Sequence, residues 1–199
     1  MAVAVELRGI NKRFGAVQAN AQVDLTVPAG TIHGIVGENG AGKSTLMSIL
    51  YGFYQADSGA IAIDGRPAHI HHSSDAIALG VGMVHQHFML VETLSALDNV
   101  MLGAEPHWHL KRARQMVRDK LLPLMRESGL QVRLDALVSE LPVGERQRLE
   151  ILKTLYRGAR ILILDEPTAV LTPAETLALF DTLRAGRAGC RTRPRSRPG

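Results

Sequence analysis

A glycine-rich segment near residue 40 carries the residue types needed to hold a phosphate chain. Residues 37–44 read GENGAGKS and fit the pattern G-x-x-x-x-G-K-[ST]. Glycine lets a tight loop turn its backbone N–H groups toward phosphate oxygens without a side-chain clash. The lysine of the pattern pairs with the β- and γ-phosphates, and the serine places a hydroxyl on Mg²⁺. The pattern therefore predicts a site for a nucleoside triphosphate.

The residues expected to contact the phosphates form one continuous run. They are Gly37, Glu38, Asn39, Gly40, Ala41, Gly42, Lys43, Ser44 and Thr45. The run is expected to open a helix, whose N-terminus favours anions. A chance glycine loop is the alternative, and the full pattern arises by chance in under about 1% of chains of this length.

A second group of chemistry-bearing residues follows an apolar run, ILIL at residues 161–164. The run ends in Asp165, which would lie at the mouth of a buried sheet, where a carboxylate can hold Mg²⁺ directly or through water. Glu166 comes next and could polarise an attacking water as a general base. The alternative is a core strand that happens to stop at two acids, and the phosphate-loop pattern upstream disfavours it.

Length and composition narrow the class of protein. The chain has 199 residues, 46% apolar and 21% charged, which is ordinary for a soluble globular protein and excludes fibrous and wholly disordered classes. Its one cysteine, Cys190, cannot form an internal disulfide, which favours a reducing compartment. No apolar run approaches the roughly 20 residues of a membrane span, and the N-terminus lacks the features of a signal peptide.

The positive net charge of +4 comes from one end of the chain. Residues 184–199 hold six arginines and no acid, so residues 1–183 carry a net charge of −2. The main body is therefore slightly acidic, and the charge does not indicate a nucleic-acid partner.

Hydrophobic periodicity predicts the elements that position these residues. Strands are expected at residues 3–7, 23–27, 31–36, 61–63, 81–84 and 160–164. Helices are expected at 43–50, from 73 or 74 to 79, over most of 94–130 with breaks at Pro106 and Pro123, at 144–156 and at 173–183. The strand at 31–36 leads into the glycine loop and the helix at 43–50 leaves it.

At these residues the chain resembles the nucleotide-binding subunit of an ABC transporter, from residue 3 to about 185. Residues 141–148, LPVGERQR, stand where that family has its LSGGQ signature followed by QR. Gln86 matches the family's Q-loop, and residues 165–172, DEPTAVLT, resemble its Walker B motif running into the D-loop. Phe14, 23 residues before Gly37, stands where the family places an aromatic ring against adenine.

The resemblance implies an α/β fold of the P-loop NTPase type. A RecA-like core with an N-terminal β portion would carry an inserted α-helical subdomain of about residues 86–156. Residues 1–185 would form a nucleotide-binding domain that is incomplete at its C-terminus, and residues 186–199 a basic, disordered tail.

The resemblance also implies roles for single residues, with ATP and Mg²⁺ as cofactors. Glu166 and Gln86 would be catalytic, and Ser44, Gln86 and Asp165 would hold the metal. Gly144 would open a helix whose N-terminal amides face the γ-phosphate bound to a second ABC nucleotide-binding domain, in tandem or in a dimer.

Finer likeness points to importers of simple sugars or nucleosides, on residues 84–90, 152–158 and 165–173. The expected function is ATP binding and hydrolysis that power uptake. The implied partners are transmembrane permease subunits, and the implied location is cytoplasmic, peripheral on the inner face of the cell membrane. Two alternatives stay open: a truncated, catalytically inactive nucleotide-binding fragment, and a soluble ABC ATPase that acts outside transport.

Several positions depart from the family pattern. Pro142, Val143 and Glu145 replace Ser, Gly and Gln of the signature, and Thr172 replaces the D-loop aspartate. Proline offers neither a hydroxyl nor an N–H to a phosphate, so a weak composite site is expected.

The end of the chain departs further. The family has a switch histidine about 30 residues after the Walker B acid, yet no histidine follows Glu166 here. Residues from about 185 onward are rich in Arg, Gly and Pro, which suggests a frameshift or premature end. Poor solubility and negligible turnover are then expected, and whether the chain is an ATPase stays open.

Overall fold

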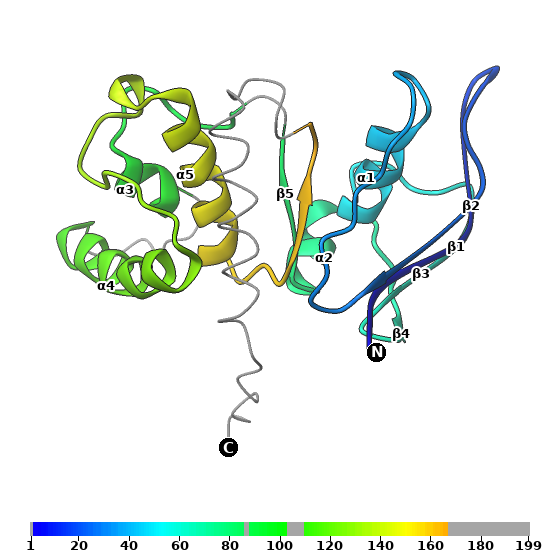
Figure 1. The fold of residues 1–199 in the computed structure, drawn as a ribbon, viewed down its shortest axis with the longest axis horizontal. Coiled ribbons are helices and arrows are strands. Elements are labelled where there is room, and N and C mark those ends of the chain that lie inside the picture. The colour runs from blue at the N-terminus through cyan, green and yellow to red at the C-terminus, as the bar shows by residue number, and fades with distance from the viewer. Residues whose placement is uncertain (1, 86–87, 103–109, 167–199) are drawn as a thin grey trace. The chain divides into compact units, whose positions relative to one another are not determined.

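A computed structural model describes residues 2–85, 88–102 and 110–166 of the chain (Figure 1). The chain divides into two compact units. In the described part of the chain, the first comprises residues 2–85, 88–89 and 153–166, and the second comprises residues 90–102 and 110–152. The expected break at Pro106, the helix at 173–183 and the tail at 186–199 lie outside the described residues.

The first unit contains a four-stranded antiparallel sheet in the order β2-β1-β3-β4. Its strands are β1 (Val3–Phe14), β2 (Val17–Pro28), β3 (Ser58–Ile63) and β4 (Arg66–Pro67). Alternating apolar and polar residues in β1 bury Val5 and Leu7 on one face, and a register shift between Leu7 and Ile10 lets Ile10 be buried as well. The strands expected at 3–7, 23–27 and 61–63 are confirmed, and each extends further than its alternating residues indicate.

A separate pair of parallel strands lies in the same unit. β5 (Val81–Val84) pairs with β6 (Ile161–Leu164) in a register that sets Val81 opposite Ile161. Both strands were expected from their apolar runs. All four residues of β5 are buried, whereas only Ile163 of β6 is fully buried.

The strand expected at residues 31–36 is wrong: the structure gives this segment no strand. Its apolar side chains are exposed, and Val36 is 96% exposed. A strand exists only where a neighbour completes its ladder of backbone hydrogen bonds, and no described residue pairs with 31–36. β-prone residues were therefore insufficient to make a strand here.

Two helices complete the first unit. α1 (Lys43–Tyr51) confirms the helix expected after the glycine loop, and it buries Leu46, Ile49 and Leu50 as its spacing predicts. α2 (Ser73–Ala78) is the short helix expected before β5. The core of the unit consists of Val5, Leu7, Ile10, Leu46, Ile49, Leu50, Ile63, Ile70, Ala76, Val81, Met83 and Ile163.

The second unit is helical in the part that the structure describes. It contains α3 (Ala96–Met101), α4 (Leu110–Ser128), the 3₁₀ turn η1 (Val138–Glu140) and most of α5 (Val143–Tyr156). The helix expected at 144–156 is confirmed. The break expected at Pro123 is wrong, because α4 runs through it. Leu121 and Met125 on either side are buried, and this packing offsets the hydrogen bond that a proline removes from a helix.

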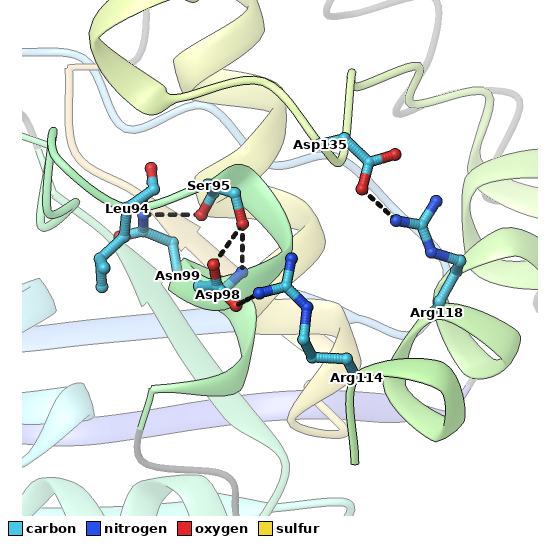
Figure 2. Close-up of polar contacts among 7 residues, drawn as sticks. All are labelled: Leu94, Ser95, Asp98, Asn99, Arg114, Arg118 and Asp135. Atoms are coloured by element: carbon cyan, nitrogen blue, oxygen red, sulfur yellow. Dashed lines mark hydrogen bonds and ion pairs between the residues drawn. The ribbon is translucent and has the colours of Figure 1, made fainter. Parts of the chain in front are cut away.

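Polar contacts fix the start of α3 within the second unit (Figure 2). The Ser95 hydroxyl accepts a hydrogen bond from the Asp98 N–H and donates one to the Asp98 carboxylate, which is an N-cap arrangement. Arg114 of α4 lies 2.7 Å from the same carboxylate. Arg118 of α4 pairs with Asp135. The Arg114 contact joins α3 to α4, and the Arg118 contact joins α4 to the segment before η1.

Candidate functional site

The glycine-rich loop lies between residue 36 and the first turn of α1. Lys43 Nζ reaches back over the loop and donates to the carbonyl oxygens of Gly37, at 2.7 Å, and Glu38, at 2.8 Å. The Ala41 N–H donates to the same Glu38 carbonyl at 3.1 Å. The ammonium group thus lies on the loop whose backbone was expected to hold phosphates. This donor set of an ammonium, a hydroxyl and backbone amides at a helix N-terminus fits an anion.

The backbone conformation of the loop requires glycine most strictly at position 42. Gly40 and Gly42 have φ angles of 83° and 80°, a region that residues with a Cβ rarely adopt. A Cβ on Gly40 would meet open space, whereas a Cβ on Gly42 would lie 2.0 Å from the Ala19 carbonyl oxygen in β2. Gly42 is therefore the position where the loop presses against the antiparallel sheet.

Asn20 of β2 holds the same point of the loop. Its Nδ2 donates to the Gly42 carbonyl at 3.1 Å, and the residue is only 5% exposed. The Oδ1 atom is buried without a hydrogen-bond partner in the described part of the chain. Sequence reasoning missed this residue, and the available signal was a polar side chain on the inward-facing side of an alternating strand.

The structure brings two of the expected metal-binding residues together. Ser44 Oγ in the first turn of α1 donates to Asp165 Oδ1 at 3.0 Å, although 121 residues separate them. The Asp165 N–H donates to the Val84 carbonyl at 3.2 Å, which continues the parallel ladder past the end of β6. Mg²⁺ takes oxygen ligands and is usually held by one or two protein oxygens together with phosphates. A hydroxyl and a carboxylate side by side fit that ion.

No cluster of three His, Cys, Asp or Glu side chains that could hold a metal by themselves lies among the described residues. A metal at Ser44 and Asp165 would therefore depend on ligands from elsewhere, such as phosphate oxygens or water. Gln86, the third expected metal-binding residue, lies outside the described residues, as does Thr172.

Glu166, the expected general base, directly follows Asp165 and is exposed. Its φ angle of 47° is in the left-handed region, which costs a residue with a Cβ on the order of 1–3 kcal/mol. Such strain clusters at functional sites. The chain therefore turns sharply at the end of β6 and sets two carboxylates in succession there.

Phe14, the expected base-stacking residue, ends β1 and is 43% exposed. Its ring lies 5.1 Å from that of Tyr54, centroid to centroid, at an interplanar angle of 72°. Lys12 Nζ lies over the Phe14 ring, 5.4 Å from its centroid. The structure thus gives Phe14 a fixed aromatic neighbour that the sequence did not indicate.

Gly144 is buried in the first turn of α5, in the second unit. The Pro142 carbonyl accepts from the N–H groups of Glu145, at 2.9 Å, and Arg146, at 3.0 Å, so the helix begins directly after the proline. Glu145 is buried, and its carboxylate accepts from the N–H and the guanidinium of Arg133. Glu145 therefore anchors the start of α5 within its own unit.

Comparison with known proteins gives consistent results. The family described as "ABC transporter" matches residues 21–169. The guanosine import ATP-binding protein of Bacillus subtilis is 47% identical over 188 residues, which cover 92% of this chain and 36% of that protein. The ribose import ATP-binding protein of Burkholderia thailandensis is 49% identical over 185 residues, covering 92% of this chain and 37% of that protein. The chain thus spans little more than a third of the length of these relatives.

Solved structures agree on the fold. An ATP-binding cassette of an ABC transporter in its ADP conformation has a TM-score of 0.82 at 23% identity and covers 94% of this chain and 78% of that one. A dimeric bacterial ABC transporter cassette has a TM-score of 0.73 at 22% identity, with 92% and 83% covered. The expected α/β fold of a P-loop NTPase is confirmed. Among the described residues, no helix has the length and apolar character that crossing a membrane requires.

Proposed function

Since the chain belongs to the ABC transporter family, we propose that it binds ATP with Mg²⁺ as the ATP-binding part of an importer for a nucleoside or a simple sugar. The observation that carries the nucleotide site is the 3.0 Å hydrogen bond from Ser44 to Asp165. It joins the end of the phosphate loop to the carboxylate after β6. The solute class rests on the relatives, which are named for guanosine and ribose import.

In this proposal the loop residues from Gly37 to Thr45 hold the phosphates. Lys43 supplies a positive charge, and it would exchange its two carbonyl contacts for phosphate oxygens. Ser44 and Asp165 hold Mg²⁺, with Gln86 as the third expected partner. The ion would neutralise part of the charge on the phosphates.

Hydrolysis would use Glu166 as the general base, with Gln86 as the second catalytic residue. The base must lie close to the phosphate site, and its position next to Asp165 supports that role. In a form of the protein that turns over ATP, Glu166→Gln should slow hydrolysis by roughly 10²–10⁴-fold, because it removes the base while keeping the side-chain shape. An unchanged rate would place the base elsewhere.

The remaining roles concern partners. Gly144 would face the nucleotide of a second ABC nucleotide-binding domain. ATP binding would drive permease subunits in the membrane. In this proposal the protein lies on the cytoplasmic side, peripheral to the cell membrane. The relatives named as import ATP-binding proteins support the permease partner and the location.

A second candidate is a chain that binds ATP without turning it over. One observation favours it. Ile32, Ile35 and Val36, in the segment that leads into the phosphate loop, are exposed and outside any strand. Phosphate release from the purified chain separates the candidates: sustained release at a rate that Glu166→Gln abolishes would reject the inactive form.

The metal-dependent site is tested by calorimetric titration with ATP, in Mg²⁺ and in EDTA. Ser44→Ala and Asp165→Asn should each reduce affinity in Mg²⁺ by about tenfold or more, because each removes a contact to a charged ligand. In EDTA their effects should shrink. Ser74→Ala, an exposed serine in α2, is the matched control and should bind as the unchanged chain does. Absence of ATP binding in the unchanged chain would reject the proposed function.

A further inference from the structure

We propose that Tyr54 and Asp57, in the loop that leaves α1, are positioning residues for the nucleotide base, acting by fixing Phe14 at the end of β1. This proposal rests on the proposed function, since it assumes that Phe14 stacks on the base. Neither Tyr54 nor Asp57 belongs to the motifs that indicated the phosphate site. The argument begins with the irregular pairing at the end of β1.

The last residues of β1 pair with β2 alone, because the pairing with β3 ends at Asn11. The pairing of β1 with β2 shifts register between Ile10 and Lys12 and again between Lys12 and Arg13. The pairing with β3 shifts between Arg8 and Asn11. Such shifts disrupt the ladder of hydrogen bonds locally and bend the strand. A ring that must present one orientation to a ligand therefore needs support from outside the ladder.

Asp57 supplies that support through three hydrogen bonds. One carboxylate oxygen accepts from Lys12 Nζ at 2.8 Å, and the other accepts from the Arg13 N–H at 2.7 Å. The Asp57 N–H donates to the Asn11 carbonyl at 2.9 Å. The Lys12 hydrogen bond, followed by the Arg13 N–H, lowers the pKa of the Asp57 carboxyl. The carboxylate is therefore ionised at neutral pH and holds Lys12 and Arg13, while the backbone N–H of Asp57 holds Asn11.

Tyr54 supplies the contact to the ring. The two rings meet edge to face with centroids 5.1 Å apart, a favoured geometry for aromatic pairs. Tyr54 is itself 45% exposed, so the pair presents aromatic surface to solvent. Lys12 lies over the Phe14 ring as well as on Asp57. The ring is thus restrained by a tyrosine and by a lysine that Asp57 holds.

The loop is in turn fixed to the helix that leaves the phosphate loop. The N–H groups of Phe53, at 2.8 Å, and Tyr54, at 3.3 Å, both donate to the Ser48 carbonyl in α1. A helix of nine residues is about 13 Å long and rigid. The two ends of α1 therefore serve two parts of one nucleotide. Its first turn contacts the phosphates, and the loop after its last turn supports Phe14, which stacks on the base.

The test compares ATP with inorganic tripolyphosphate, which has the phosphates but no base, in calorimetric titrations of the full chain. Tyr54→Ala should weaken ATP binding by roughly two- to tenfold, the range for an aromatic edge-to-face pair, and leave tripolyphosphate affinity unchanged. Tyr54→Phe keeps the ring and should restore ATP binding. Phe53→Ala is the matched control, an exposed aromatic in the same loop whose ring contacts Tyr51 and His85; it should leave ATP binding unchanged.

A double variant tests whether Tyr54 acts through Phe14. In a Phe14→Ala background, Tyr54→Ala should have no additional effect on ATP affinity, because the group through which it acts is gone. A full additional loss in that background would overturn the proposal, as would an equal loss for ATP and tripolyphosphate or no loss at all. If Phe14→Ala weakens ATP binding and Tyr54→Ala does not, the proposal fails while the proposed function stands. If the unchanged chain binds neither ligand, both fail.

Discussion

The first unit contains two sheets that are completed to different degrees. In the antiparallel sheet, β1 is hydrogen-bonded on both sides, to β2 and to β3, and its inward residues are fully buried. The parallel sheet has two strands of four residues each, and the apolar segment at 31–36 joins neither sheet in the described residues. The phosphate loop follows that unpaired segment. Helix α1 and single side-chain contacts, more than pairing in a sheet, therefore hold the phosphate loop.

The largest change in the free energy of unfolding is expected in the antiparallel sheet. It is compared with a substitution in the unpaired segment at residues 31–36. Ile10→Ala, at a residue with 0% exposure, should lower the free energy of unfolding by about 2–5 kcal/mol. Val36→Ala should change it by less than about 0.5 kcal/mol. Urea unfolding followed by circular dichroism measures both. Equal losses would mean that residues 31–36 are packed as well as β1 is.

The next effect separates two glycines of the phosphate loop. Gly42→Ala forces a Cβ against the Ala19 carbonyl and into a left-handed backbone, which should cost about 2–4 kcal/mol. Gly40→Ala meets open space and pays only the backbone strain, roughly 1–2 kcal/mol. The same unfolding measurement applies. If Gly40→Ala is the more damaging variant, the loop is not seated against β2 as the structure has it.

A smaller effect is expected at Asn20, where the antiparallel sheet contacts the phosphate loop. Asn20→Ala removes the hydrogen bond to the Gly42 carbonyl, worth about 1 kcal/mol, and should weaken ATP binding by roughly fivefold. Thr26→Ala, an exposed residue of the same strand, is the control. ATP affinity that is equal in the two variants would show that the sheet does not orient the loop.

The smallest effect concerns pH and the irregular end of β1. The lowered pKa of Asp57 means that its carboxylate stabilises the folded chain above the ordinary carboxyl pKa, near 3.9. That contribution is lost as pH falls through the lowered pKa. The difference in thermal midpoint between the unchanged chain and Asp57→Asn should therefore be constant from pH 8 to 5 and shrink below about pH 3.9. A difference that grows on acidification would contradict the assigned contacts.

The sequence was sufficient to predict the elements that are marked by a local motif or by a short run of apolar residues. The helix α1 follows from the glycine loop and from the spacing of Leu46, Ile49 and Leu50, and its buried face is as expected. The strands β5 and β6 follow from short apolar runs. Their parallel pairing with each other does not follow from the sequence, because pairing is a relation between segments 80 residues apart.

The errors arose where a neighbour decides the outcome. Residues 31–36 have the composition of a strand, yet a strand requires a partner. Proline usually interrupts a helix, yet α4 continues through Pro123, because the burial of Leu121 and Met125 stabilises it. Tyr54 and Asp57 gave no signal, because each acts through a contact with a distant residue. At Asn20 the signal was a polar residue on the inward-facing side of a strand, which does not reveal its contact with Gly42. The motif residues could be named in advance, whereas the residues that orient them required the structure.

The most direct test of nucleotide binding at the phosphate loop is the affinity for Mg²⁺-ATP of the unchanged chain and of Lys43→Ala, measured by calorimetric titration. Lys120→Ala removes the same charge from an exposed site in the second unit and serves as the control. We predict that Lys43→Ala weakens binding by about tenfold or more, since a charge-assisted contact is worth roughly 1.5–3 kcal/mol, and that Lys120→Ala binds unchanged. Equal affinity of the Lys43→Ala variant and the unchanged chain would contradict the assignment of the site.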